Sequence, residues 1–169
     1  MAKAAPEALS RPGQVGQASR NRACRCSAPQ IRKYQGRISG PLLDRIDLHV
    51  EVPSVRYRAL AEGRGGESSA SIKTRVAAAR AAQKKRLGDA GILTNARMTE
   101  RQIRRYCTID EESHHLLDMA IEKLGLSARA MNRVLKVSRT IADLEGKEKI
   151  EPAHVAEAIQ YRSLDRGII

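Results

Sequence analysis

Within residues 99–165, four successive segments repeat apolar residues at spacings of three and four, the period of an amphipathic helix. Each segment also begins with a residue type that favours a helix start. These residues are Thr99 with Gln102 as a capping box, Asp110, Ser127, and Pro152 in a first turn. Gly125 and Gly146 follow the second and third segments, where glycine commonly ends a helix. The pattern predicts a small helical bundle.

The composition fits a bundle core made from aliphatic side chains. The sequence has no Trp and no Phe, and aromatic residues make up 2% of it, which favours packed helices over a β-sandwich. The predicted inward-facing residues are Ile103, Tyr106 and Cys107 in the first helix, Leu116, Leu117, Ala120, Ile121 and Leu124 in the second, Met131, Val134, Leu135, Ser138, Ile141 and Ala142 in the third, and Val155, Ala156 and Ile159 in the fourth. The predicted fold class is mainly α.

One segment, residues 46–52, has the alternation of a β-strand instead. Its apolar residues are Ile46, Leu48, Val50 and Val52. An isolated strand is not stable, so we expect this one to belong to a sheet whose other strands lie in sequence outside the chain. A short helix is predicted before it, beginning with a capping box at Ser27 and stopping at Gly36.

Another helix, predicted to begin at Ser68 or Ser69 and to reach about Leu87, is strongly basic. It has only a thin apolar stripe, formed by Ile72, Val76, Ala79 and Gln83. The whole chain carries a formal net charge of +12, which favours association with polyanions such as nucleotides and nucleic acids. The alternative is that the charge balances an acidic partner domain. If DNA binds, the predicted contacts are Lys73, Arg75, Arg80, Lys84, Lys85 and Arg86.

The three cysteines indicate neither a disulfide framework nor a complete metal site. Cys24 and Cys26 have the spacing of half a zinc site, but two thiolates cannot close one, so free thiols are predicted. Cys107 is predicted to be a small buried residue. His114 and His115 point in different directions from one helix, which favours solvated side chains over metal ligands. We therefore predict no metal site. The cysteine usage favours a reducing, cytoplasmic location. No apolar run approaches the length needed to span a bilayer, so no membrane contact is predicted.

The sequence also lacks the motifs of a self-sufficient enzyme. No Gly-rich loop ends in Lys-Ser or Lys-Thr, and the run Gly63–Gly66 has neither the preceding strand nor the lysine of a phosphate-binding loop. No nucleophile lies at motif spacing from a base, and no paired-carboxylate motif is present. His49 and His154 are predicted to have no functional role. We expect the chain alone to be inactive and to hold no cofactor.

Longer motifs identify a family. The pair Cys24/Cys26, then Tyr34, then the run Ser39–Asp47 (SGPLLDRID) resemble the stretch after sensor 1 in the YifB/ComM-like, Mg-chelatase-related AAA+ ATPases. The second half resembles the C-terminal lid of the same family. The motifs that carry this are Asn95-Ala96, Gly125–Ala130 (GLSARA), Thr140–Leu144 (TIADL) and Glu157–Arg162 (EAIQYR). The resemblance covers roughly residues 20–166 and implies the C-terminal portion of an ATP-dependent, DNA-acting ring motor of the competence and branch-migration type, with helicase character.

The resemblance assigns roles to two arginines. Arg45 matches the catalytic arginine finger, which one subunit offers to the ATP γ-phosphate of its neighbour, and Arg129 matches the nucleotide-contacting sensor 2 of the lid. The intact relative would use ATP and Mg²⁺, form a homohexameric ring with its AAA+ core, and act on DNA. The implied regions are a disordered or truncated segment (1–22), the end of the AAA+ core with the finger segment and strand (23–58), a linker and basic helix (59–96), and the lid bundle (97–169). The family's second Cys-x-Cys pair, upstream of Cys24, is absent here.

The residues themselves leave alternatives open. Arg45 could instead form a surface salt bridge with Asp44 or Asp47. Arg129, Arg133 and Lys136 share one polar helix face, which could be an anion site or an ordinary solvated face. The chain could also be a free-standing basic module that binds DNA without sequence preference, or a non-functional truncated product.

Overall fold

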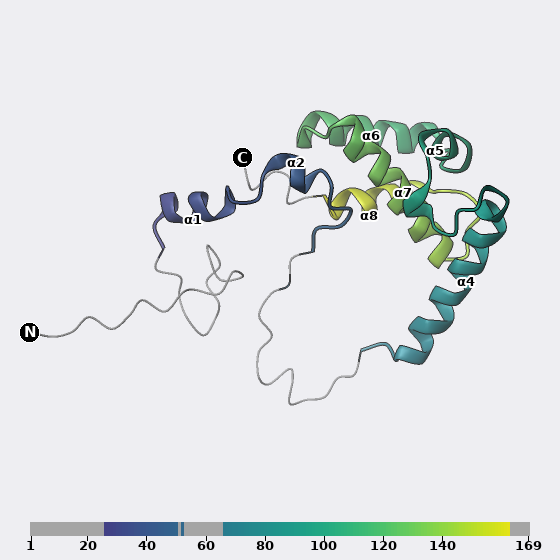
Figure 1. Ribbon diagram of the computed structural model, residues 1–169. Coiled ribbons are helices and arrows are strands. Elements are labelled where there is room, and N and C mark those ends of the chain that lie inside the picture. The colour runs from purple at the N-terminus through teal and green to yellow at the C-terminus, as the bar shows by residue number, and fades with distance from the viewer. Residues whose placement is uncertain (1–25, 51, 53–65, 163–169) are drawn as a thin grey trace, which may run out of the picture.

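The computed structural model describes residues 26–50, 52 and 66–162, and this part of the chain is mainly helical. Two short helices, α1 and α2, precede a long helix α4 and a group of four helices, α5–α8 (Figure 1). The bounds are Ala28–Gln35 for α1, Gly40–Leu43 for α2, Ser69–Leu87 for α4, Glu100–Tyr106 for α5, Glu111–Leu124 for α6, Ala128–Leu144 for α7 and Pro152–Gln160 for α8, with short 3-10 turns η1 at Gly88–Ala90 and η2 at Asn95–Arg97. Among the described helices, none combines the length and the apolar character needed to cross a lipid bilayer.

The four helices predicted within residues 99–165 are confirmed, and each starts where its capping residue lies. The Asp110 carboxylate accepts a hydrogen bond from the Ser113 amide at 2.9 Å, and the Ser127 hydroxyl accepts one from the Ala130 amide at 3.1 Å. These bonds satisfy amides that the first turn of a helix leaves without an intrahelical partner. Local sequence therefore sets where the bundle helices begin.

The core of the bundle is aliphatic, as the composition predicts. Its most buried members come from α5–α8 and from the flanking turns and the end of α4. They are Leu87, Met98, Ile103, Cys107, Leu117, Ala120, Leu126, Ala130, Val134, Ile141, Ala142, Ile150, Val155 and Ala158. The long helix α7 runs through the middle of this group and packs against α4, α5 and α8. Stacked helix stripes of this kind close a core without large aromatic side chains.

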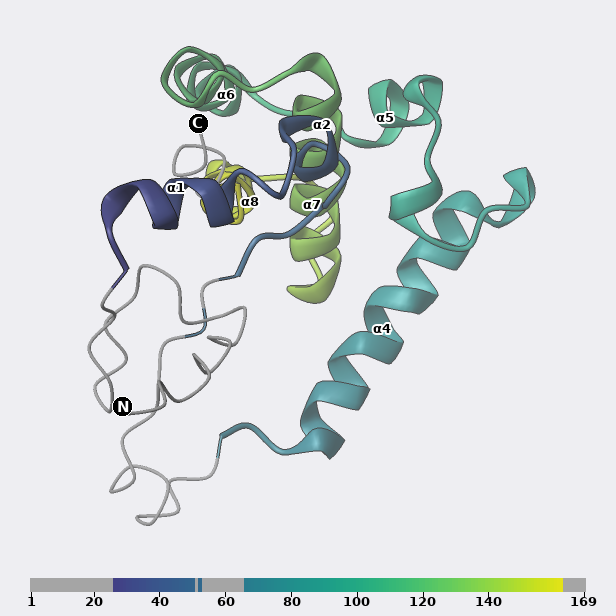
Figure 2. The ribbon, with the colours of Figure 1, turned by 60° about the vertical axis from the view of Figure 1, so that its left-hand side comes forward.

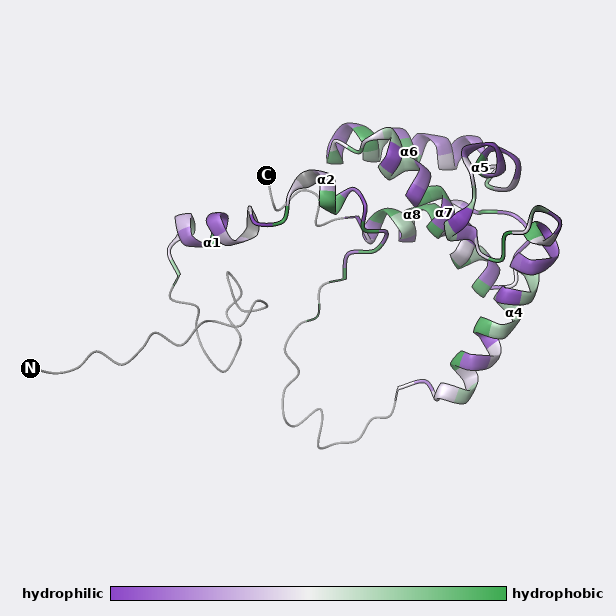
Figure 3. Cartoon of the chain, in the orientation of Figure 1, coloured by the Kyte–Doolittle hydropathy of each residue, from purple (hydrophilic) through white to green (hydrophobic). Residues whose placement is uncertain are grey.

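Helix α4 is confirmed, but only its C-terminal half packs on the bundle. Ala79, Gln83 and Leu87 are buried, whereas Ile72 and Val76 on the same stripe are 41% and 42% exposed. Figure 2 shows the reason: the N-terminal half of α4 extends away from α7. Hydrophobic and hydrophilic residues both lie along this free half (Figure 3).

The strand predicted for residues 46–52 is wrong for the part of it that the structure describes. Residues 46–50 and 52 form no strand, and no other strand occurs among the described residues. A strand needs a neighbour to accept its backbone hydrogen bonds, and no neighbour is available here. The His49 amide instead donates to the Tyr161 carbonyl at 2.8 Å. His49, predicted to be on the polar side, is consequently buried.

The short helix α1 is confirmed, with the Ser27 amide bonded to the Gln30 side chain at 2.7 Å and Gly36 directly after the helix. The segment predicted for residues 1–22 lies outside the described residues, as do Cys24 and the first part of the predicted linker, residues 59–65.

Candidate functional site

Arg45 lies just after the one-turn helix α2, with its side chain exposed. Its guanidinium donates a hydrogen bond to the Pro41 carbonyl at 2.8 Å. That carbonyl belongs to α2, and carbonyls near the end of a helix lack intrahelical partners, so a cation is favourable there. Leu43, two residues before Arg45, is 8% exposed and anchors α2. A guanidinium has five N–H donors, so this single bond leaves Arg45 able to bind an anion.

The two aspartates that flank Arg45 form contacts with the bundle. Asp44 accepts a hydrogen bond from the Ser127 hydroxyl at 3.0 Å and lies 3.6 Å from the Arg162 guanidinium. Asp47 forms an ion pair with Arg133. Among the described residues, neither aspartate forms an ion pair with Arg45. The salt-bridge alternative for Arg45 therefore does not describe this arrangement.

Two backbone contacts hold the same region against the C-terminal end of α8. The Arg162 guanidinium donates to the Ile46 carbonyl, and the His49 amide donates to the Tyr161 carbonyl. Arg162 is 1% exposed, although it carries a charge. We call residues 40–50 the Arg45 segment. This segment lies against the start of α7 and the end of α8, which meet at the same side of the bundle (Figures 1 and 2).

Arg129 is in the first turn of α7, and its side chain is exposed. The other two cations predicted to share its face have partners of their own: Arg133 binds Asp47, and Lys136 donates to the Ala96 carbonyl at 2.9 Å. The face is therefore not a cluster of three available cations. Because Ser127 binds Asp44, the start of α7 and the residue next to Arg45 are in direct contact. The structure thus brings together the two short stretches that contain Arg45 and Arg129.

Sequence reasoning missed a buried polar network between α4, η2 and α7. Asp143 lies at its centre, accepting from Asn95 at 2.8 Å, from the Arg139 Nε atom at 3.1 Å and from Arg86 at 3.1 Å. Arg139 also donates to the carbonyls of Lys147 and Glu148, and Asn95 donates to Thr140. Burial lowers the pKa of Arg139, and the carboxylate of Asp143 opposes that shift. The available signal was an Arg/Asp pair four residues apart on the otherwise apolar face of α7.

His154 was also missed, because a histidine is an unusual partner in a capping box. The residue is 1% exposed, its Nδ1 atom accepts from the Glu151 amide at 2.8 Å, and its Nε2 atom lies 3.0 Å from the Glu145 carboxylate. His154 therefore fixes the start of α8.

The remaining metal and nucleophile candidates give no site. Cys107 is 4% exposed, and burial raises the pKa of its thiol to about 11, so it stays protonated near neutral pH. His114 and His115 are exposed, as predicted. Within the described residues, no group of three or more metal-binding side chains comes together.

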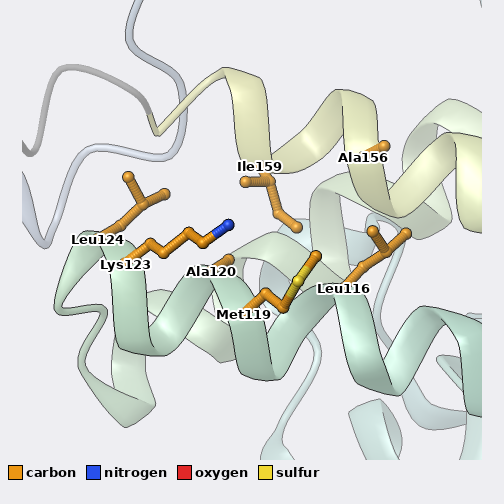
Figure 4. A pocket seen from close by; sticks show the side chains of 7 residues that line it. All are labelled: Leu116, Met119, Ala120, Lys123, Leu124, Ala156 and Ile159. Atoms are coloured by element: carbon orange, nitrogen blue, oxygen red, sulfur yellow. The ribbon is translucent and has the colours of Figure 1, made fainter.

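An apolar hollow of about 290 Å³ lies between α6 and α8 (Figure 4). Its lining residues are Leu116, Met119, Ala120, Lys123, Leu124, Ala156 and Ile159. Lys123 is the only charged residue among them. Small-molecule sites usually add several convergent polar groups to an apolar wall, and this hollow does not have them.

Comparison with known proteins places these features in a family. Residues 66–162, more than half of the chain, match the model for the C-terminal part of magnesium chelatase subunit ChlI, and residues 7–60 match the model for magnesium chelatase subunit ChlI. The chain is 43% identical over 143 residues to competence protein ComM of Haemophilus influenzae, and 42% identical over 146 residues to YifB of Escherichia coli. A further relative, Rv2897c of Mycobacterium tuberculosis, is 36% identical over 139 residues.

These alignments cover 82–86% of the chain but only 27–28% of each relative. The chain therefore spans about a quarter of the length of the relatives it matches. The segment that carries Arg45 and the bundle that carries Arg129 both lie within the matched residues. The chain belongs to the magnesium chelatase subunit ChlI family, with ComM and YifB among its relatives.

Proposed function

We propose that this chain is the C-terminal portion of an ATP-dependent, DNA-acting AAA+ ring motor. In this proposal Arg45 is the arginine finger, Arg129 is the sensor 2 residue of a helical lid, and α5–α8 form that lid. ATP and Mg²⁺ would be held by parts of the motor outside this sequence, because the sequence contains no phosphate-binding loop. The name of the relative from Haemophilus influenzae, competence protein ComM, supports the competence part of this proposal.

The observation that carries the proposal is the geometry around Arg45. Its guanidinium is exposed and bonded only to a carbonyl among the described residues, while the neighbouring aspartates are bound to the bundle. A planar, permanently charged donor suits the negative charge that spreads over the phosphoryl oxygens in the transition state. Arg129 is exposed on the adjoining start of α7, where a second cation could reach the same or a neighbouring nucleotide.

The first test is to change the arginine that matches Arg45 in a full-length relative. Arg45→Ala should leave ATP binding largely unchanged and lower kcat by roughly a thousandfold, because the finger stabilises the transition state more than bound ATP. Arg45→Lys should not restore the rate, since an ammonium cannot reproduce the planar fork. Steady-state ATPase assays and nucleotide titrations measure both quantities.

A matched control is Arg104→Ala, which removes a similarly exposed arginine from α5. Mixing Arg45→Ala subunits with subunits unable to bind ATP adds a second test, because a finger acts across a subunit boundary. Interfaces that pair an intact finger with an intact nucleotide site should recover turnover. If mixed rings form without recovered activity, or if Arg45→Ala leaves kcat unchanged, Arg45 is not the finger.

A second candidate function is a basic module that binds DNA without sequence preference. The observation that favours it is a basic face of α4 that is exposed in both halves of the helix. Lys73, Arg80 and Lys84 lie at spacings of seven and four, so they share one face of the helix, and all three are exposed. This function is compatible with the ring motor, since such a motor must hold its DNA.

A further inference from the structure

The Arg45 segment is attached to the bundle on both sides of Arg45. Before it, Asp44 contacts Ser127 at 3.0 Å and Arg162 at 3.6 Å. After it, the Ile46 carbonyl binds Arg162, Asp47 binds Arg133, and the His49 amide binds the Tyr161 carbonyl at 2.8 Å. Arg45 is the exposed residue between these two sets of contacts.

The contacts come from two helices that are distant in sequence. Ser127 and Arg133 belong to the cap and the first half of α7, whereas Tyr161 and Arg162 directly follow α8. The Arg45 segment therefore lies across the point where α7 and α8 meet. Its partners on both helices are more than 80 residues away from it in the sequence. Contacts to two helices fix both the position and the direction of a short irregular segment, which a contact to one helix would not.

The charges in this attachment depend on one another. Arg162 is 1% exposed, and the Asp44 carboxylate and the Ile46 carbonyl compensate part of its charge. Removing one partner of a buried charge is costly because the other charge remains buried. The Asp47–Arg133 pair is more exposed, with side chains 49% and 25% accessible, and an exposed pair alone contributes little. Its value here is that it fixes the residues on the other side of Arg45.

We propose that Asp44, Asp47, Arg133 and Arg162 are positioning residues for Arg45. They hold the Arg45 segment on the helical bundle, so that Arg45 and Arg129 move as one unit when the bundle moves. This inference rests on the proposed finger role of Arg45. It adds that the bundle, through four charged side chains, sets where the finger guanidinium points.

The attachment itself is tested on this chain without any nucleotide. Amide hydrogen exchange, followed by NMR, reports on the His49 amide, and the Cys107 amide, bonded to the Ile103 carbonyl at 2.8 Å, serves as an internal reference. Asp47→Asn and Arg133→Gln should each speed exchange at His49 by up to about fivefold, with little change at Cys107. Glu100→Gln removes an exposed carboxylate from α5 and should change neither amide.

The charge swap Asp47→Arg with Arg133→Asp distinguishes the ion pair from a general effect of either substitution. It should return the His49 amide close to the original rate, because the pair is restored with its signs reversed. Unprotected exchange at His49 in the original chain would overturn the proposal. So would equal exchange in Asp47→Asn and in the original chain.

The consequence for catalysis is tested in a full-length relative that has aspartate and arginine at the matching positions. Asp47→Asn and Arg133→Gln should lower kcat by about tenfold with the KM for ATP nearly unchanged, and the charge swap should recover most of the rate. A merely structural role would change expression or stability without this split and this recovery. If Arg45→Ala lowers kcat but Asp47→Asn does not, the positioning role fails and the finger role stands. If Arg45→Ala leaves kcat unchanged, the finger role itself fails.

Discussion

Single residues in this chain show how partners decide the role of a charge. Two arginines, Arg86 and Arg139, bind the Asp143 carboxylate. Arg45, in contrast, is exposed and binds the Pro41 carbonyl. Arg86 and Arg139 therefore serve stability, and Arg45 is available to an external anion. Asp143, 4% exposed, is the residue on which the two internal arginines depend.

Asp143→Asn tests this dependence. The substitution keeps the shape of the side chain but removes the charge that compensates Arg139, which is 2% exposed. We expect the free energy of unfolding to fall by about 3–5 kcal/mol, the usual range when a buried ion pair loses one partner. Urea denaturation, with the midpoint and the m-value fitted together, measures the change.

Glu100→Gln is the matched control for Asp143→Asn, because it also neutralises a carboxylate four residues from an arginine, but at an exposed site. Its effect should stay within about 0.5 kcal/mol. A loss below about 1 kcal/mol for Asp143→Asn would mean that the network relaxes around the uncompensated arginine, for example by admitting water.

At the scale of secondary-structure elements, helix starts follow local capping chemistry. Asp110 is exposed yet begins α6 through its bond to the Ser113 amide, and hydrogen bonds from Ser113 lower its pKa. A lowered pKa means that the ionised form stabilises the fold. That contribution is present above the unfolded-state pKa and is lost as the pH falls through the folded-state pKa.

Asp110→Ala should therefore lower the free energy of unfolding at neutral pH, as for other lost N-caps. Asp110→Asn should be nearly neutral, because asparagine caps as well as aspartate does. Thermal or urea unfolding of the two variants gives the comparison. An equal loss in both would show that the carboxylate charge, through the helix dipole, matters more than the capping bond.

At the scale of the whole molecule, the net charge is +12, but not every basic side chain is available to an external partner. Of the six basic residues predicted to contact DNA, Arg75 binds Glu67 and Arg86 binds Asp143. Lys73, Arg80, Lys84 and Lys85 are exposed on α4. The contact surface expected for a polyanion is therefore smaller than the sequence suggests and lies mainly on the face with Lys73, Arg80 and Lys84.

We expect weak DNA binding that does not depend on sequence and falls steeply with salt. The slope of log K against log salt concentration should be about −0.9 for each phosphate contact. Changing Lys73, Arg80 and Lys84 to Gln should reduce the slope by about 2–3. Fluorescence anisotropy at several salt concentrations measures this.

The control for that experiment changes Arg101, Arg104 and Arg105 on α5 to Gln, which removes the same charge from another exposed helix. The control should retain most of the original slope. Equal losses in both triple variants would show that net charge, and not α4, governs binding. Binding that survives high salt, or strongly prefers one sequence, would contradict the non-specific mode.

The sequence alone determined the elements whose signals are local. The helix starts at Thr99, Asp110, Ser127 and Pro152 depend on contacts within three or four residues and were predictable. The apolar part of the buried stripe of α7, with Val134, Ile141 and Ala142, was predictable from its period. The motif around Arg45 was also recognisable, because a family resemblance depends only on the order of the residues.

Only the tertiary structure decided which of these signals prevailed. The alternation in residues 46–52 predicted a strand, but a strand also needs a neighbouring strand. The His49 amide instead donates its hydrogen bond to the Tyr161 carbonyl. In the same way, Arg133 was indistinguishable from Arg129 on a helical wheel until Asp47, 86 residues earlier, was placed beside it. Long-range pairing depends on the positions of both partners in space, which local periodicity does not encode.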